Sequence, residues 1–127
     1  MSIRKRLPLR AVAIPAAVAA FAFALTSCAA APEPIEVAPG AVLLDVRTPS
    51  EYAEGHLDGA QLLDFNGGEL AAAIPSLDPE AEYLVYCRSG NRSGQAIALM
   101  QQAGFSHLTN LGSLEQAASA VGIEIVR

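Results

Sequence analysis

One short loop holds the residues of greatest chemical interest in this chain. Cys87 opens the sequence Cys-Arg-Ser-Gly-Asn-Arg-Ser, which follows the apolar run 83–85 and precedes the helix-forming segment 94–100. This order puts a cysteine between a buried strand and a helix N-terminus, where backbone N–H groups favour a thiolate and attract an anion. We therefore expect Cys87 to be a nucleophile and the following loop residues to bind its anionic substrate. These residues are Arg88, Ser89, Gly90, Asn91, Arg92 and Ser93.

The first 27 residues have the pattern of an export signal. Four basic side chains precede the apolar, alanine-rich segment 11–25, which is shorter than the about 20 residues that a membrane-spanning helix needs. The following Leu-Thr-Ser-Cys-Ala resembles a bacterial lipobox, in which the cysteine is lipidated and becomes the new N-terminus. We interpret residues 1–27 as a lipoprotein signal peptide and Cys28 as the lipidation site. The alternative is an ordinary signal peptide cleaved after Ala29 or Ala31.

This interpretation predicts an exported protein. We expect it either in the periplasm or lipid-anchored to the outer face of the bacterial cell membrane, with no other membrane contact. The 100 residues after the signal suffice for one small domain. They hold four basic side chains against 13 acidic ones, a net charge of −9 that argues against a nucleic-acid partner. No obvious apolar patch is present, so we expect a monomer.

The cysteine count also indicates a reactive thiol. If Cys28 is lipidated, Cys87 is left unpaired in an oxidising compartment, where an odd cysteine is worth examining as a functional group. Two alternatives are an inert buried cysteine and a Cys28–Cys87 disulfide in a non-lipidated form. The polar, glycine-bearing surroundings of Cys87 argue against the first, and the second would tie a flexible N-terminal segment to the loop.

The segments around the loop alternate between strand and helix patterns. Residues 28–39 are interpreted as a flexible tether with a short strand near 35–37, and residues 40–127 as the domain. Thr48-Pro49-Ser50-Glu51 combines a capping box with a first-turn proline, so we expect a short helix that ends at Gly55. We also expect strands at 42–46, 61–65, 83–87, 105–109 and 123–126, and helices at 69–74, 93–103 and 113–121. This order predicts an α/β fold with a small parallel sheet of four or five strands and helices on both faces.

Three motifs resemble those of rhodanese (thiosulfate sulfurtransferase) domains, most closely the small exported single-domain members. The motifs are Leu43-Leu44-Asp45-Val46-Arg47-Thr48-Pro49-Ser50-Glu51-Tyr52, Gly55-His56-Leu57-Asp58-Gly59-Ala60 and the Cys87 loop. The resemblance extends over residues 35–127 and implies the rhodanese-like fold. It also implies an enzyme of the thiosulfate sulfurtransferase type. In such an enzyme Cys87 takes the outer sulfur of thiosulfate as a persulfide and passes it to cyanide or a thiol.

The resemblance implies roles for individual residues and no metal or cofactor. Arg88 and Arg92 are candidates for thiosulfate binding, the alternative for each being a side chain that points to solvent. Gly90 would permit a turn that presents its N–H group. Ser89 and Ser93 would donate O–H bonds to sulfur, although Ser93 could instead cap the following helix.

Three residues outside the loop are expected to support the site. We interpret Asp45 and Arg47 mainly as a structural charge pair that frames the pocket. His56 is expected to be a structural hydrogen-bonding group rather than a catalytic base. Two departures from the family pattern are Asp58, where proline is common, and the tryptophan-free segment 111–114, which leaves the outer wall of the pocket undefined.

Two other functions are consistent with parts of the pattern. Phosphatases and arsenate reductases of similar architecture use Cys-x5-Arg, whereas the spacing from Cys87 to Arg92 is one residue shorter. A non-catalytic rhodanese-like module that binds a partner or carries persulfide sulfur would keep the same loop, so sequence does not separate it from an enzyme.

Overall fold

Four parallel strands form the centre of the fold. In the computed structural model, which describes Ala13 and residues 33–127, they lie in the order β3-β1-β4-β5. The strands are β1 (Val42–Asp45), β3 (Gln61–Leu62), β4 (Tyr83–Tyr86) and β5 (Leu108–Gly112). All four residues of β4 are buried, as expected for an inner strand of a parallel sheet.

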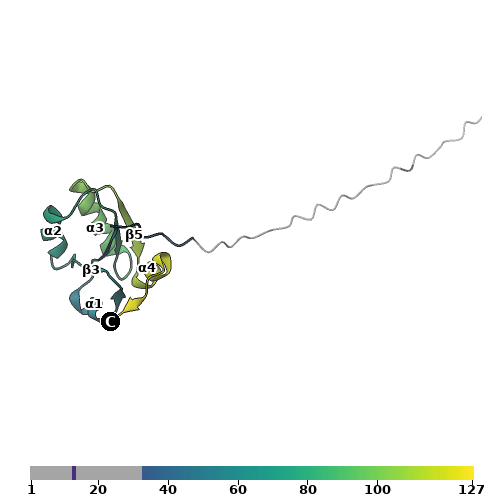
Figure 1. Ribbon diagram of the computed structural model, residues 1–127, viewed down its shortest axis with the longest axis horizontal. Helices are drawn as coiled ribbons and strands as arrows, with labels where there is room; N and C mark the ends of the chain where they lie inside the picture. Colours follow the sequence, from purple (N-terminus) through teal and green to yellow (C-terminus); the bar gives the residue numbers. More distant parts are fainter. Residues whose placement is uncertain (1–12, 14–32) are drawn as a thin grey trace, which may run out of the picture.

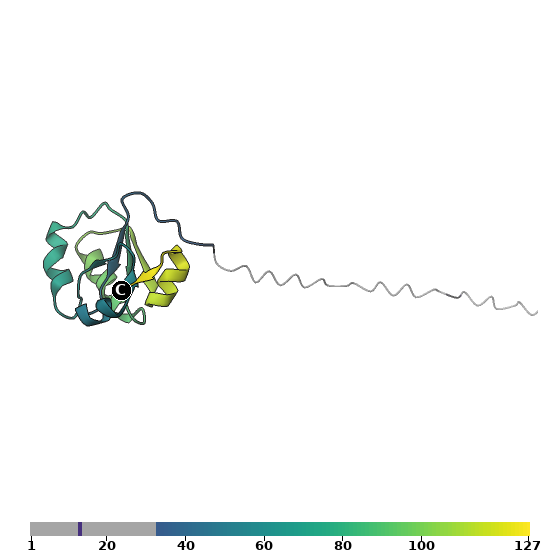
Figure 2. The ribbon, with the colours of Figure 1, turned by 60° about the horizontal axis from the view of Figure 1, so that its bottom comes forward.

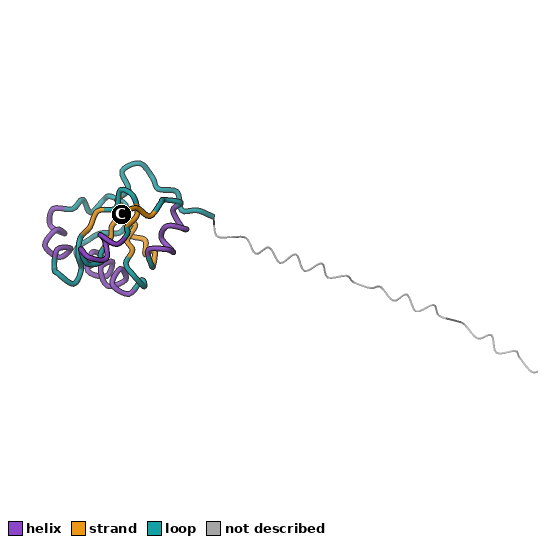
Figure 3. The backbone as a smooth tube through the Cα atoms, turned by 90° about the horizontal axis from the view of Figure 1, so that it is seen from below, coloured by secondary structure: helices purple, strands orange, loops and turns teal. Residues whose placement is uncertain are grey.

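Helices cover both faces of this sheet (Figures 1 and 2). They are α1 (Pro49–Glu54), α2 (Glu69–Ala73), the short 3₁₀ helix η1 (Ile74–Ser76), α3 (Asn91–Gln102) and α4 (Leu114–Val121). α2 and α3 pack against one face through Leu70 and Met100, and α4 packs against the other through Ala117. Figure 3 shows the strands enclosed between these helices. The predicted α/β fold with a parallel sheet is confirmed.

The alternating side chains of the inner strands build two separate cores. Leu44 and Val85 point to the side of α2 and α3, whereas Leu43 and Leu84 point to the side of α4. Because successive residues of a strand face opposite sides, a continuous apolar run is needed to fill both cores. The two cores fix the sheet and therefore the strand ends from which the site loops emerge.

The beginning of α1 follows from its local sequence. Thr48 caps the helix, its hydroxyl accepting from the Glu51 N–H while the Glu51 carboxylate accepts from the Thr48 N–H. Proline occupies the first turn, and the helix ends before Gly55. The predicted capping box and both ends of this short helix are therefore confirmed.

Several predicted element boundaries are wrong. Residues 35–37 form a loop, because the Ile35 N–H donates to the carbonyl of Ala120 in α4 and not to a strand. The strand predicted at 61–65 has only two residues, the strand predicted at 105–109 lies at 108–112, and α3 begins at residue 91. Pairing with β4, which places Leu108 opposite Tyr83, determines where β5 begins.

The C-terminal strand does not join the main sheet. β6 (Ile125–Val126) pairs antiparallel with β2 (His56–Leu57), and His56 lies opposite Val126. The prediction of an edge strand at 123–126 is thus partly right, but this strand belongs to a separate two-stranded sheet. The pairing brings the C-terminal residues next to the end of α1.

The predicted signal peptide and Cys28 lie outside the described residues, apart from Ala13. Within the part of the chain that the structure describes, no helix combines the length and apolar composition that crossing a membrane requires.

Candidate active site

The carboxyl ends of β1 and β4 place the candidate residues at one edge of the sheet. These strands are parallel neighbours with Asp45 opposite Tyr86, so the chain leaves both at the same level. Arg47 follows β1 by two residues and Cys87 follows β4 directly. Open α/β sheets bind their ligands at this edge, so topology brings together two segments that are distant in sequence.

The sulfur of Cys87 is surrounded by hydrogen-bond donors. The Gly90 N–H donates to Sγ at 2.9 Å and the Ser93 hydroxyl lies 3.4 Å from it. The backbone N–H of Cys87 donates to the Gly112 carbonyl of β5 at 2.9 Å, which holds the residue against the sheet. This arrangement matches the prediction that the loop turns its N–H groups toward the thiol.

Burial and hydrogen bonding act on the thiol in opposite directions. Burial, the largest single effect, raises the pKa of Cys87, because a charged sulfur loses water. The Ser93 hydroxyl, together with the backbone N–H groups of Ser93, Ser89 and Gly90, stabilises the thiolate and outweighs burial. The pKa of Cys87 is therefore held below its usual range, which favours nucleophilic chemistry.

Cys87 is free and fully buried, with 0% of its surface exposed. The side chains of Arg88 and Ser89 just after it are exposed, so the sulfur lies beneath a loop that faces solvent. Sequence reasoning expected the polar surroundings, which are present, but not complete burial. A ligand reaches Sγ only when the atoms that cover it move.

Gly90 and Ser93 have the loop geometry that the helix start requires. Gly90 precedes α3 with φ of 91°, a left-handed conformation that favours glycine, and a Cβ there would lie 3.4 Å from the Gly112 Cα. Ser93 is the third residue of α3, and the cap residue is Gly90. The alternative that Ser93 caps the helix is therefore wrong, because its hydroxyl turns to Cys87 and to Asn110 instead.

Asn110 is a site residue that sequence reasoning missed. Its side chain accepts from the Ser93 hydroxyl at 2.7 Å and from the Gly112 N–H at 3.0 Å, and it donates to the Gly90 carbonyl at 3.1 Å. It thereby links β5 to the middle and to the last residue of the cysteine loop. The strand predicted at 105–109 ends before Asn110, so no signal in the sequence placed this residue on the strand or in the site.

The two loop arginines differ in their surroundings. Arg92 forms a two-pronged ion pair with Glu51 of α1, with N···O distances of 2.8 and 2.9 Å. Within residues 33–127 no hydrogen bond or ion pair reaches the guanidinium of Arg88, which is exposed. Arg88 is therefore the loop cation available to an incoming anion, and Arg92 joins the loop to α1.

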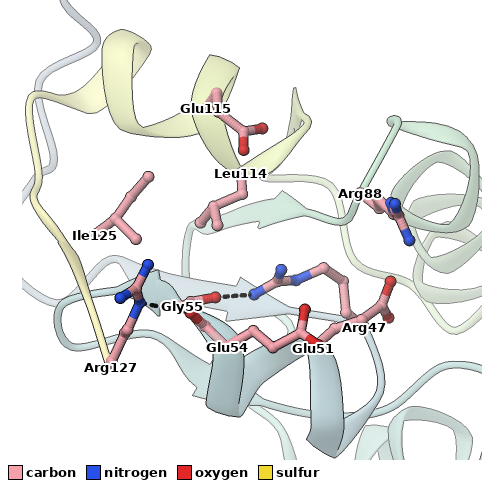
Figure 4. Close-up of a pocket in the computed structure, with 9 residues that line it drawn as sticks. All are labelled: Arg47, Glu51, Glu54, Gly55, Arg88, Leu114, Glu115, Ile125 and Arg127. Atoms are coloured by element: carbon pink, nitrogen blue, oxygen red, sulfur yellow. Dashed lines mark hydrogen bonds between the residues drawn. The ribbon is translucent and has the colours of Figure 1, made fainter.

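Asp45 and Arg47 form the predicted charge pair. Arg47 donates to the Asp45 carboxylate at 2.6 Å. The same nitrogen donates to the Gly55 carbonyl at 2.6 Å (Figure 4). Both residues are buried. Burial lowers the pKa of Arg47, but the hydrogen bond and charge of Asp45 outweigh it and raise the pKa above its usual value. The pair holds β1 to the end of α1. The charge of each side chain is neutralised by that of the other.

His56 and Tyr86 also make structural contacts. His56 Nδ1 lies 2.9 Å from the Tyr52 carbonyl, and its ring stacks on the Tyr52 ring at 3.7 Å. The Tyr86 hydroxyl accepts from the Leu57 N–H at 3.0 Å. Burial raises the pKa of Tyr86 well above its usual range, so this phenol stays neutral.

A cavity of about 380 Å³ lies beside the cysteine loop, between α1, the start of α4 and β6 (Figure 4). Its lining residues are Arg47, Glu51, Glu54, Gly55, Arg88, Leu114, Glu115, Ile125 and Arg127. Leu114 and Ile125 form the apolar part of its wall, and Arg88 is the one residue of the cysteine loop among its lining residues. Among the described residues no cluster of histidine, cysteine, aspartate and glutamate could hold a metal ion.

Comparison with known proteins agrees with the fold. Residues 32–120 match the family model of the rhodanese-like domain. The chain is 34% identical over 77 residues to the thiosulfate sulfurtransferase PspE of Escherichia coli K12, covering 59% of this chain and 72% of that protein. It is 40% identical over 74 residues to the thiosulfate sulfurtransferase GlpE of Pseudomonas entomophila, covering 58% of this chain and 66% of that protein.

A longer relative and two solved structures extend this comparison. A probable adenylyltransferase/sulfurtransferase, MoeZ of Mycobacterium tuberculosis, is 40% identical over 72 residues, but the match covers 54% of this chain and only 18% of MoeZ. The crystal structure of the rhodanese-like domain of the Anabaena protein Alr3790 has 30% identity and a TM-score of 0.59, covering 68% of this chain and 98% of that one. A rhodanese with anions from Escherichia coli has 29% identity and a TM-score of 0.56, covering 68% of this chain and 98% of that one.

The fold and these similarities thus define an α/β domain of the sulfurtransferase class. The chain belongs to the rhodanese-like domain family.

Proposed function

We propose that the protein is a sulfurtransferase that carries sulfur on Cys87. The observation that supports this most directly is the buried sulfur held by donors from Gly90 and Ser93, which lower the pKa of the thiol. A persulfide anion needs the same stabilisation as the thiolate, because it places negative charge on a sulfur in the same loop.

The proposed first step is a sulfur–sulfur displacement. The Cys87 thiolate attacks the outer sulfur of thiosulfate, a new sulfur–sulfur bond forms, and the old one breaks as sulfite leaves with the bonding electrons. Arg88 attracts the donor, since it is the unpaired cation of the loop within the described residues. In the second step cyanide or a thiol removes the outer sulfur and restores the thiolate.

Steady-state kinetics test this proposal. Thiosulfate and cyanide should give thiocyanate and sulfite with parallel double-reciprocal lines, because the two substrates react with separate forms of the enzyme. Cys87→Ser should abolish the reaction while the circular dichroism spectrum is retained. Activity in that variant, or a requirement for both substrates at once, contradicts the mechanism.

A non-catalytic carrier is the second candidate function. The complete burial of Cys87 favours it, because repeated turnover needs repeated opening of the loop. Single-turnover measurements separate the two. A carrier accepts sulfur once and releases it slowly, whereas an enzyme releases it at the steady-state rate.

We also propose that the protein is an exported lipoprotein attached through Cys28 and otherwise monomeric. The basic and apolar segments before Cys28 support this proposal. Labelling of growing cells with a radioactive fatty acid should mark the protein, and Cys28→Ala should remove the label and the membrane attachment. Unchanged labelling in Cys28→Ala contradicts it.

A further inference from the structure

The Ser93 hydroxyl has two possible hydrogen-bond acceptors and one proton to donate. The Ser93 oxygen lies within donating distance of both the Cys87 sulfur, at 3.4 Å, and the Asn110 Oδ1, at 2.7 Å. A serine hydroxyl carries one proton, so it can donate to only one of these acceptors at a time.

The orientation of the Asn110 amide is determined by its other contacts. The Gly112 N–H donates to Oδ1 at 3.0 Å, and Nδ2 faces the Gly90 carbonyl at 3.1 Å. A reversed amide would point an N–H group at an N–H group and an oxygen at a carbonyl. Oδ1 therefore faces Ser93, and it competes with the sulfur for the hydroxyl proton.

We propose that Asn110 is a positioning residue that provides a second acceptor for the Ser93 hydroxyl. Ser93 then donates to Asn110 or to the sulfur, according to whether the sulfur is neutral or charged. While Cys87 is a thiol, its S–H points to the Ser93 oxygen and Ser93 donates to Asn110. When sulfur becomes an anion, the Ser93 proton turns to it. Asn110 remains satisfied in this second state, because the Gly112 N–H still donates to its Oδ1.

This arrangement gives Asn110 two effects that oppose each other. It holds the Ser93 oxygen and the Gly90 carbonyl in place, which keeps the donors aimed at sulfur. It also stabilises the thiol form, because ionisation of Cys87 gives up the short Ser93–Asn110 bond. The thiolate part of this inference stands without the proposed function, whereas its extension to the persulfide rests on that function.

A double-mutant cycle measures the competition. Iodoacetamide reacts with the thiolate, so its rate at Cys87 below the midpoint of the thiol titration, divided by the plateau rate above that midpoint, reports the thiolate population. The division removes the effect of how often the atoms that cover the buried sulfur move aside, and this normalised rate is the one compared between variants. Peptide mass spectrometry separates this reaction from that of Cys28 in the full chain. One hydrogen bond corresponds to a change of roughly two- to tenfold in rate. Ser93→Ala should slow alkylation by this factor, and Asn110→Ala should accelerate it by a similar factor.

The combined variant gives the decisive comparison. In the Ser93→Ala background there is no hydroxyl proton to compete for, so Asn110→Ala keeps only its effect on the shape of the loop and should leave the alkylation rate unchanged or slow it. If Asn110→Ala slows the reaction with Ser93 present, or has the same effect in both backgrounds, Asn110 acts only on the shape of the loop and the inference is wrong. Asn66→Ala controls for the substitution itself, because Asn66 is exposed and its side chain makes no hydrogen bond within residues 33–127.

A second variant covers the case in which Asn110→Ala disrupts the loop. Asn110→Asp keeps the size and the acceptor but loses the Nδ2 donor to the Gly90 carbonyl, a loss that is the same with and without Ser93. A carboxylate binds the Ser93 proton about twice as strongly as an amide. Alkylation should slow by a larger factor with Ser93 present than with Ala at that position. Equal factors would mean that only the bare charge acts on sulfur. Because no sulfur donor is used, these results stay interpretable even if thiosulfate fails to load Cys87.

Discussion

Glu51 joins the first turn of α1 to the cysteine loop, and its replacement by glutamine should uncouple them. Its carboxylate accepts from the Thr48 N–H at 3.0 Å and from two Arg92 nitrogens at 2.8 and 2.9 Å. Glu51→Gln keeps the size of the side chain but removes the charge that pairs with Arg92. We expect the free energy of unfolding at neutral pH to fall by about 1–3 kcal/mol, between the values for exposed and buried ion pairs.

The pKa of Glu51 gives an independent magnitude. The hydrogen bond from Arg92, which is the largest cause, and those from Thr48 outweigh burial and lower the pKa from 4.5 to about 2. The side chain is only 18% exposed. A difference of about 2.5 pH units corresponds to about 3 kcal/mol. Because the folded pKa is the lower one, this contribution is complete above pH 4.5 and is lost as the pH falls towards about 2.

Urea unfolding at a series of pH values measures both quantities. The stability difference between the parent and Glu51→Gln should be largest near neutral pH and should shrink between pH 4.5 and about 2. Glu54→Gln is the matched control, since Glu54 lies on the same helix, is exposed and has no side-chain bond within residues 33–127. A Glu51→Gln difference that is independent of pH would refute the reasoning.

Three other substitutions have expected outcomes. Arg88→Ala should raise the KM for thiosulfate roughly two- to fivefold and leave discharge of the persulfide by a neutral thiol unchanged, because Arg88 is an exposed cation. Equal effects on both steps would argue against donor binding by Arg88. Tyr86→Phe should cost roughly 1–3 kcal/mol in urea unfolding, because the Leu57 N–H loses its buried acceptor, and a parent-like midpoint would contradict this. Gly90→Ala should cost roughly 1–2 kcal/mol, because φ is 91° and Gly112 lies close by; a parent-like unfolding free energy would contradict the strain argument.

The parts of the fold that depend on local chemistry were predictable from sequence. The capping box at Thr48 and the apolar run of β4 identify their elements because each signal lies within a few residues. The start of β5 was not predictable, since it depends on pairing with Tyr83 of a distant strand. The segment near Ile35 has strand-like residues, but its N–H meets a helix carbonyl that local sequence does not reveal.

In the site, too, features set by neighbouring residues were predictable from sequence, and contacts between distant segments were not. The position of Cys87 after β4 and the turn at Gly90 follow from the order of residues in the loop. The partner of Arg92 is 41 residues away on α1, and Asn110 is 17 residues beyond Ser93 on β5. Neither contact leaves a periodic signal in the sequence, because both arise when the strand ends meet. The burial of Cys87 likewise depends on how the whole loop closes.

The central claim is that Cys87 receives a sulfur atom. Incubation of the full chain with thiosulfate, followed by mass spectrometry of the peptide that contains Cys87, tests it directly. The account predicts a gain of one sulfur atom on that peptide, its loss on addition of cyanide, and no gain in Cys87→Ser. A Cys87 peptide that stays at its original mass while the thiol remains free and the protein folded would contradict it.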